Sequence, residues 1–338
     1  MRLAAPRRRA IPALLGALVA SALLSGNANA QIERLDPALD ALIPADASLE
    51  RIVRDLDWSE GPAWRKSGGY LVFSDIPRNT IHRWKEGEGL SIFLRPAGYI
   101  RNDPAGLELG TNGLVFDAQD RLVMADHGNR QIARLDESNF TRTTLADRFE
   151  GKRLNSPNDL VIHSNGDIYF TDPPYGLRDL NRNPAKELDF NGVFRLTAAG
   201  ELSVVTRELT FPNGIALSPD ERTLYVAVSD PRNPVIMAYD VAADGSVSGG
   251  RLFFDGGPLA AQGKRGAPDG LTVDVRGNLF ATGPGGLLIL SPEGRHLGTI
   301  VTGQATSNAV FGDDGSTLYL TADMDIIRVR TRTRGLGF

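Results

Sequence analysis

The feature that most constrains this chain is a segment that recurs about six times. The segment from Leu154 to Gly176 reads as a polar turn, a short apolar strand, a tight turn and a second strand of aromatic and β-branched residues. Related segments follow one another at intervals of roughly 40–55 residues, a period typical of propeller blades. The repeat predicts an all-β fold, a six-bladed β-propeller whose blades are four-stranded antiparallel sheets around a central channel.

One polar residue occupies an equivalent position in each copy, roughly ten residues before the second strand. These residues are Glu60, Asn112, Asn158, Asn213, Asp269 and Asn308. If the copies are blades, equivalent offsets are equivalent places in space, and the six side chains ring one end of the channel. Asn and Asp are also common turn residues, but turn chemistry alone does not explain the same kind of residue at the same offset in every copy.

A ring of carboxylate and amide oxygens suits a hard divalent cation. Ca²⁺ accepts about six to eight oxygen ligands with loose geometry, and Mg²⁺ or Mn²⁺ would also tolerate such a site. Zn²⁺ would more often recruit His or Cys, which none of the six positions offers. The carboxylates of Glu60 and Asp269 would neutralise a dication. An open coordination position would then polarise a substrate carbonyl or activate water.

Other catalytic groups are few. Of the four histidines, His127 lies in a loop at the end of a predicted strand, where it could reach a substrate as a base. The alternative is a structural role for this histidine. The sequence has neither a glycine-rich phosphate loop nor a Gly-x-Ser-x-Gly nucleophile motif. It also has no cysteine, which excludes disulfides, thiolate zinc sites and a cysteine nucleophile.

Residues 1–30 have the pattern of a signal peptide. A positively charged start is followed by an apolar core at Ile11–Leu24, shorter than a membrane span, and by the small-x-small motif Ala28–Ala30. We expect cleavage after Ala30, a periplasmic or secreted protein, and no membrane association after cleavage. An uncleaved membrane anchor is the alternative.

Removal of residues 1–30 takes away four arginines and no acids, so the formal net charge changes from −4 to about −8. Nucleic acids require a basic binding face, so we expect no nucleic-acid partner. Without an internal linker, residues 31–338 are predicted to form a single propeller domain.

Segments outside the repeat have predicted roles of their own. Gln31–Leu49 holds a short amphipathic pattern with Pro37 at a helix start, and it is expected to pack on the propeller. Glu50–Asp57 is predicted to be a strand that closes the ring. Thr331–Phe338 is expected to fray.

Two long insertions, Phe93–Gly110 and Pro173–Asn191, interrupt the repeat. A third flexible stretch, Gly256–Ala267, leads into Asp269 and could form a rim. Loops on a rigid scaffold commonly carry specificity, and surface decoration is the alternative.

Motifs spread over nearly the whole chain after residue 30 carry a family resemblance: Trp58–Pro62, Asn112–Asp117, Asp126–Asn129, Leu154–Asp159, Phe170–Gly176, Pro212–Asp220 and Pro268–Asp274. In combination they resemble the gluconolactonase/regucalcin (senescence marker protein) family of six-bladed propellers. The resemblance implies one catalytic divalent cation at the channel mouth, held by Glu60, Asn213 and Asp269. Asn158 is implied as a further ligand or a substrate contact.

The resemblance also implies a reaction, the hydrolysis of a cyclic ester. Asn112 corresponds to a substrate-contacting position, and Asn308 is predicted as a further substrate contact. The metal would polarise the lactone carbonyl for attack by water, with Asp269 assisting proton transfer. His127 or Asp172 could take the role of base instead.

Three functions stay open at this level. The first is a metal-dependent lactonase acting on a small-molecule lactone, most simply a sugar lactone such as gluconolactone. The second is a non-catalytic propeller that binds a sugar or a protein and holds only a structural ion. The third is a phosphotriesterase activity of the diisopropyl fluorophosphatase kind at the same site. Strictosidine synthase-like propellers lack the metal ligands, so the complete ligand set argues against that branch.

Overall fold

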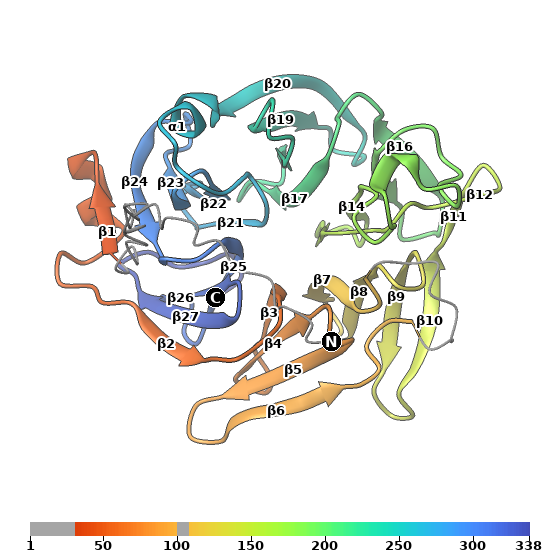
Figure 1. Cartoon of the computed structure of the whole chain (residues 1–338), viewed down its shortest axis with the longest axis horizontal. Coiled ribbons are helices and arrows are strands. Elements are labelled where there is room, and N and C mark those ends of the chain that lie inside the picture. Colours follow the sequence, from red (N-terminus) through yellow and green to blue (C-terminus); the bar gives the residue numbers. More distant parts are fainter. Residues whose placement is uncertain (1–30, 100–107) are drawn as a thin grey trace, which may run out of the picture.

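The computed structural model describes residues 31–99 and 108–338, and six antiparallel sheets surround a common centre in it (Figure 1). Five of these sheets contain four strands ordered from the centre outward, and the remaining one contains five. The arrangement confirms the predicted all-β, six-bladed propeller. The last blade takes its outermost strand from the N-terminal part of the chain, and the fifth blade carries an additional fifth strand.

The strands of the first three blades are β3 (Ser59–Arg65), β4 (Tyr70–Asp75), β5 (Thr80–Lys85) and β6 (Gly89–Leu94); β7 (Thr111–Phe116), β8 (Leu122–Asp126), β9 (Gln131–Asp136) and β10 (Thr141–Ala146); and β13 (Leu160–Ile162), β14 (Ile168–Asp172), β15 (Gly192–Leu196) and β16 (Leu202–Thr206). A small hairpin joins the second and third blades, made of β11 (Arg148–Phe149) and β12 (Lys152–Arg153).

The strands of the other three blades are β17 (Pro212–Leu217), β18 (Thr223–Val228), β19 (Val235–Val241) and β20 (Val247–Asp255); β21 (Leu271–Val273), β22 (Leu279–Gly283), β23 (Gly286–Leu290) and β24 (His296–Val301); and β25 (Thr306–Gly312), β26 (Thr317–Ala322), β27 (Asp325–Arg330) and β2 (Glu50–Val53). A short helix, α1 (Gly257–Ala261), lies within the stretch that was predicted to form a rim.

The second strand of each blade is deeply buried. Every residue of β4, β8, β14, β22 and β26 is buried, because the neighbouring blades cover both faces of these strands. Such strands read in the sequence as continuous apolar runs rather than as alternating ones. Aromatic pairs fill the spaces between strands, as where Phe170 stacks on Phe194 with ring centroids 5.3 Å apart.

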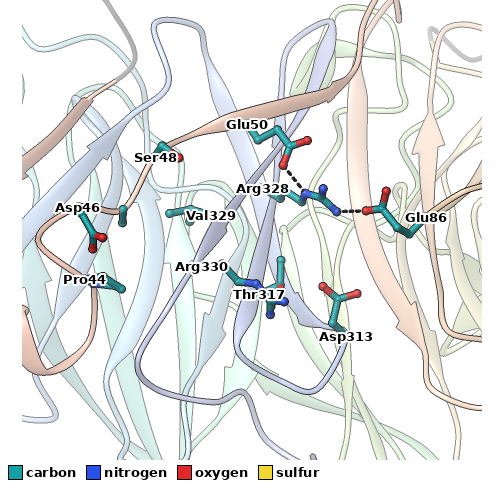
Figure 2. Close-up of a pocket in the computed structure, with 11 residues that line it drawn as sticks. Pro44, Asp46, Ser48, Glu50, Glu86, Asp313, Thr317, Arg328, Val329 and Arg330 are labelled. Atoms are coloured by element: carbon teal, nitrogen blue, oxygen red, sulfur yellow. Dashed lines mark hydrogen bonds and ion pairs between the residues drawn. The ribbon is translucent and has the colours of Figure 1, made fainter.

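The ring is closed by strands from opposite parts of the chain. β2 pairs antiparallel with β27, which confirms the closing strand predicted within Glu50–Asp57. At this seam Arg328 of β27 donates to Glu50 of β2 at 2.7 Å and also pairs with Glu86 of the first blade (Figure 2). The seam carries a cavity of about 650 Å³ whose lining includes these three residues and none of the six predicted ring residues.

The ion pairs of Arg328 are expected to add little to stability. Both carboxylate partners are more than half exposed, and exposed pairs of this kind contribute about 0.5 kcal/mol. Arg328→Ala should therefore lower the melting temperature by about one or two degrees. Tyr319→Ala, which empties a fully buried site next to Trp64, should cost about 3 kcal/mol or more. Thermal unfolding of both variants checks this order, and equal losses would contradict it.

The segment before β2 is more ordered than its sequence indicates. A 3₁₀ helix, η1 (Pro37–Ala41), begins at Asp36, whose side chain accepts from the backbone N–H of Ala38 at 2.8 Å. The helix buries Leu39, as predicted for the amphipathic pattern. The strand ahead of it, β1 (Gln31–Arg34), adds a fifth strand to the fifth blade by pairing with β24, which the sequence did not predict.

The C-terminal segment corrects one expectation. Thr331–Phe338 was expected to fray, but Thr333 Oγ1 donates to Asp274 Oδ2 at 2.7 Å and Gly335 bridges Asp274 through the backbone. Asp274 is fully buried, so its carboxylate requires such donors, and the tail supplies one of them.

The predicted signal peptide, residues 1–30, lies outside the described residues. Within the described ranges, the model contains no helix with the length and apolar character needed to cross a membrane.

Candidate active site at the channel mouth

The six predicted ring residues lie at the same end of the blades. The first residues of the inner strands pair with the last residues of the second strands, as in Ser59 with Asp75 and Thr111 with Asp126. In several blades the ladder breaks at this point with a register shift, for instance between Pro212 and Ile215. Such bulges are common beside active sites, because they turn a side chain out of its normal strand direction. The ring residues are thus placed by irregular strand starts and not by regular pairing.

Close contacts between neighbouring blades show the order of the ring. A Cβ placed on Gly61 would lie 1.9 Å from the carbonyl oxygen of Asn112, and one on Gly214 would lie 2.0 Å from that of Asp269. A Cβ on Gly270 would lie 1.9 Å from the side-chain amide carbon of Asn308. The glycine that follows a ring residue therefore leaves room for the ring residue of the next blade. This contact explains why the repeat reads as Glu-Gly, Asn-Gly or Asp-Gly at these positions.

Further contacts connect the other blades, including that of β13 with β17. Gly113 donates its backbone N–H to the carbonyl oxygen of Asn158 at 2.8 Å. Between the last and first blades, Ser307 Oγ donates to the carbonyl oxygen of Ser59 at 2.7 Å. The structure thus brings together all six residues that the sequence predicted as a ring.

The two carboxylates of the ring are unfavourably placed for negative charge. Burial and the nearby Asp269 raise the pKa of Glu60 well above its ordinary value. Burial raises the pKa of the half-buried Asp269 as well, and the charges of Asp159 and Glu108 add to this effect. Four acidic groups thus interact at the channel mouth, and a cation would offset their repulsion.

The asparagines offer oxygen ligands to such a cation. Asn213 donates through Nδ2 to Ser229 Oγ at 2.9 Å, so its carbonyl oxygen is the atom available for a metal. Asn158 directs its Nδ2 to His127 Nε2 at 3.5 Å, with the same consequence for its own carbonyl oxygen. Among the described residues no three His, Asp or Glu side chains form a metal-binding cluster. The ring fits a divalent cation that takes amide as well as carboxylate oxygens, which is the preference of Ca²⁺.

His127 lies next to this ring. Its side chain is fully buried, its Nδ1 is 2.7 Å from Glu108 Oε2, and its Nε2 faces Asn158. A carboxylate that accepts from Nδ1–H leaves the lone pair on Nε2, the nitrogen nearer the ring. Sequence reasoning found His127 but missed Glu108, because no spacing signal connects an insertion residue to a histidine on another loop.

Asp172 lies close to the ring, but its carboxylate contacts the backbone of the neighbouring loop. Its two carboxylate oxygens accept the backbone N–H groups of Asn155 and Ser156 at 2.7 and 2.8 Å. Burial raises its pKa to about 7, and the two backbone hydrogen bonds oppose that rise. These bonds hold the loop that leads to Asn158, so Asp172 positions a ring residue and faces the loop backbone. Asp75 has the same role in the first blade, where it accepts from the backbone N–H of Trp58.

Two further residues near the ring were not predicted. Asp159 replaces the glycine found after most ring residues, and it accepts from the N–H of Leu160 at 2.9 Å. Burial raises the pKa of Asp159 to about 6. Tyr175, from the second insertion, stacks on Phe211 with ring centroids 5.7 Å apart, and burial raises its pKa. The Tyr175 hydroxyl lies near Ser229 and Asn213, beside the ring.

The glycine contacts give a direct test of the ring. In Gly214→Ala the new methyl group would overlap the carbonyl oxygen of Asp269, so the backbone that carries this ligand must move. We expect the rise in melting temperature caused by Ca²⁺ to be at least tenfold smaller in this variant than in the natural protein. In the control Gly200→Ala the Cβ would have no atom within 4 Å, although φ of +90° strains the alanine. Thermal unfolding in a Ca²⁺ titration checks this, and an unchanged response of Gly214→Ala would contradict it.

Comparisons with known proteins agree with this geometry. Residues 58–323 match the family model described as the SMP-30/Gluconolactonase/LRE-like region. The chain is 41% identical to a gluconolactonase of Zymomonas mobilis over 95% of both chains. It is 25% identical to a pentonolactonase of Haloferax volcanii, over 78% of this chain and 80% of the relative. A solved structure of a gluconolactonase from Xanthomonas campestris superposes with a TM-score of 0.77 at 33% identity, covering 89% of this chain and 94% of that one.

Proposed function

Since this chain belongs to the SMP-30/gluconolactonase/LRE-like family, we propose that it is a metal-dependent lactonase that opens a sugar lactone such as glucono-1,5-lactone. The observation that carries the proposal is the ring of Glu60, Asn158, Asn213 and Asp269 at the channel mouth. Two carboxylates that repel each other, one buried and one half-buried, would form with the ring asparagines a site for one divalent cation. The relatives named gluconolactonase and pentonolactonase support the choice of reaction.

Ca²⁺ is the cation we propose, because the ligand set contains oxygens alone; Mg²⁺, Mn²⁺ and Zn²⁺ are the alternatives. Glu60, Asn213 and Asp269 would hold it, with Asn158 as the fourth ligand. When bound, the cation supplies Lewis-acid polarisation of the lactone carbonyl. Asn112 on β7 and Asn308 on β25, the inner strands on either side of β3, would hold the substrate by hydrogen bonds to its hydroxyl groups.

The proton of the attacking water needs an acceptor, and two residues qualify. His127 presents Nε2 toward Asn158, and Glu108 fixes its orientation from the other side. Asp269 is the second candidate, but a carboxylate that also binds the cation is the weaker base. We assign the base role to His127 and a positioning role to Glu108. Asp172, whose oxygens are engaged by backbone N–H groups, supports the loop of Asn158.

A substrate panel tests the reaction. The purified protein should hydrolyse glucono-1,5-lactone, measured by proton release, at least a hundredfold faster than diisopropyl fluorophosphate. A reversed preference would favour the phosphotriesterase alternative. Absence of turnover on both substrates, with a cation still raising the melting temperature, would favour the non-catalytic propeller.

Residues 1–30 lead us to propose in addition that the protein is exported to the periplasm or beyond the cell. Mass spectrometry of the protein recovered from the producing cells should give a chain beginning at Gln31. A chain that keeps residues 1–30 would contradict the proposal.

A further inference from the structure

A second cavity, of about 740 Å³, extends from the loop after β8, beside the ring, to the turn between β9 and β10. Both predicted insertions contribute to its lining, the first with Tyr99 and the second with Leu177. The loop that follows β8 contributes His127 and Arg130. Because His127 also contacts Asn158, this histidine stands in the wall between the cavity and the ring. The volume is that of a pocket for a small molecule.

The lining of this cavity is strongly basic. It includes four arginines and one acidic residue, Asp147; the arginines are Arg130, Arg142, Arg148 and Arg153. Arg148 lies 3.9 Å from both Asp147 and Glu187, so its charge is partly balanced. No acidic side chain of residues 31–99 or 108–338 forms an ion pair with any of the other three arginines. Their guanidinium groups bond to backbone carbonyl oxygens instead, and these do not neutralise a full charge.

Arg130 is the most unusual of the four. It is only 7% exposed, and it donates to the carbonyl oxygens of Leu154 at 2.8 Å and Ala185 at 2.9 Å. Its Nη2 has no hydrogen-bond partner among the described residues. Burial and the charge of Arg153 lower its pKa. The nearby charges of Asp172 and Glu187 offset these effects only in part, and a buried guanidinium without an ion-pair partner among the described residues is stabilised when an anion comes to it.

We propose that this cavity, here called the arginine cavity, binds a carboxylate or phosphate group. Guanidinium groups match the planar, paired acceptors of these anions, and several arginines around one cavity are the usual means of holding them. The anion has two possible sources. It is part of the lactone itself, so that the substrate class is acidic sugar lactones, or it is a separate molecule that binds beside the active site. The first source rests on the proposed lactonase function, whereas the binding site itself does not.

Calorimetric titration of the full protein with inorganic phosphate and with 6-phosphogluconate tests the binding site. We expect both probes to bind the natural protein. Arg142→Gln and Arg153→Gln should each weaken binding at least tenfold. Arg276→Gln, which removes the same charge from an exposed turn of the fifth blade, should leave binding unchanged. Melting curves confirm that the variants fold. The proposal would be overturned if neither probe binds at about 10 mM, which is about the weakest dissociation constant expected of a binding site. It would also be overturned if Arg276→Gln weakened binding as much as the other two variants.

Kinetics then distinguish the two sources. If the anion belongs to the substrate, Arg153→Gln should raise KM for 6-phosphogluconolactone about tenfold and leave KM for glucono-1,5-lactone unchanged. If the anion is separate, added phosphate should change the turnover of both lactones alike, and Arg153→Gln should abolish that response. Failure of the lactonase proposal would appear as absence of turnover with both lactones, while the calorimetric result would still decide the binding site.

Discussion

Asp269→Asn and Glu60→Gln are each expected to lower the hydrolysis of glucono-1,5-lactone by about a thousandfold or more. Each substitution keeps the size of the side chain but removes one of the two charges that hold the proposed cation. Lewis-acid polarisation by a bound metal contributes several kcal/mol to a hydrolytic transition state, and about 1.4 kcal/mol corresponds to a tenfold change in rate. The loss should appear in kcat/KM in the presence of saturating Ca²⁺.

In the absence of metal, the same substitutions should stabilise the folded protein, although they lower its activity. Burial and mutual repulsion disfavour both carboxylates in the folded protein, so neutral Asn or Gln should raise the melting temperature in chelator. The rise caused by added Ca²⁺ should disappear. Glu86→Gln, which removes an exposed carboxylate at the ring seam, is the matched control and should behave as the natural protein. Full activity in Asp269→Asn would show that this residue is not a metal ligand.

His127→Ala is expected to lower kcat by about a hundredfold to ten-thousandfold, the usual contribution of a general base. The imidazole is fully buried, and its Nε2 is the nitrogen that faces the ring. Glu108→Gln removes the charge that orients the imidazole of His127 but keeps a hydrogen-bonding group, so it should lower kcat about tenfold to a hundredfold. KM should change little in both variants, because neither residue is assigned a substrate contact.

A second pair of measurements separates catalysis from structure at this histidine. Ca²⁺ should still raise the melting temperature of His127→Ala, since the four proposed ligands remain. In Glu108→Asp, which keeps the charge on a shorter side chain, part of the lost kcat should return. If His127→Ala retains full kcat, the base is Asp269 and the Glu108–His127 pair is structural.

The fold was predictable because each copy of the repeat contains its own turn and strand residues. Each copy places turn residues before a continuous apolar strand, and closing the ring is the only way to bury both faces of strands such as β4 and β14. The closing strand β2 could be predicted for the same reason. The pairing of β1 with β24 and the anchoring of Thr333 by Asp274 could not, because neither contact belongs to the repeat or is needed to close the ring.

The ring was predictable, but its surroundings were not. The six ring residues share an offset in the repeat, and that offset becomes a position in space once blades form. Glu108 and Tyr175 share no such offset, because they belong to insertions that are absent from other blades, and Asp159 stands where most copies have a glycine. Asp172 shows the reverse case: it is the last residue of a second strand near the ring, but its carboxylate holds the backbone of Asn155 and Ser156. Sequence position alone does not distinguish a residue that faces the channel from one that supports the loop behind it.

The most direct test of the account is the metal dependence of hydrolysis. Glucono-1,5-lactone would be offered to the protein after exhaustive treatment with chelator, and then again with Ca²⁺, Mg²⁺, Mn²⁺ and Zn²⁺ restored one at a time. We expect no turnover without metal, full recovery with Ca²⁺, and no recovery with any metal in Asp269→Asn. Turnover that persists at full rate in metal-free protein would contradict it.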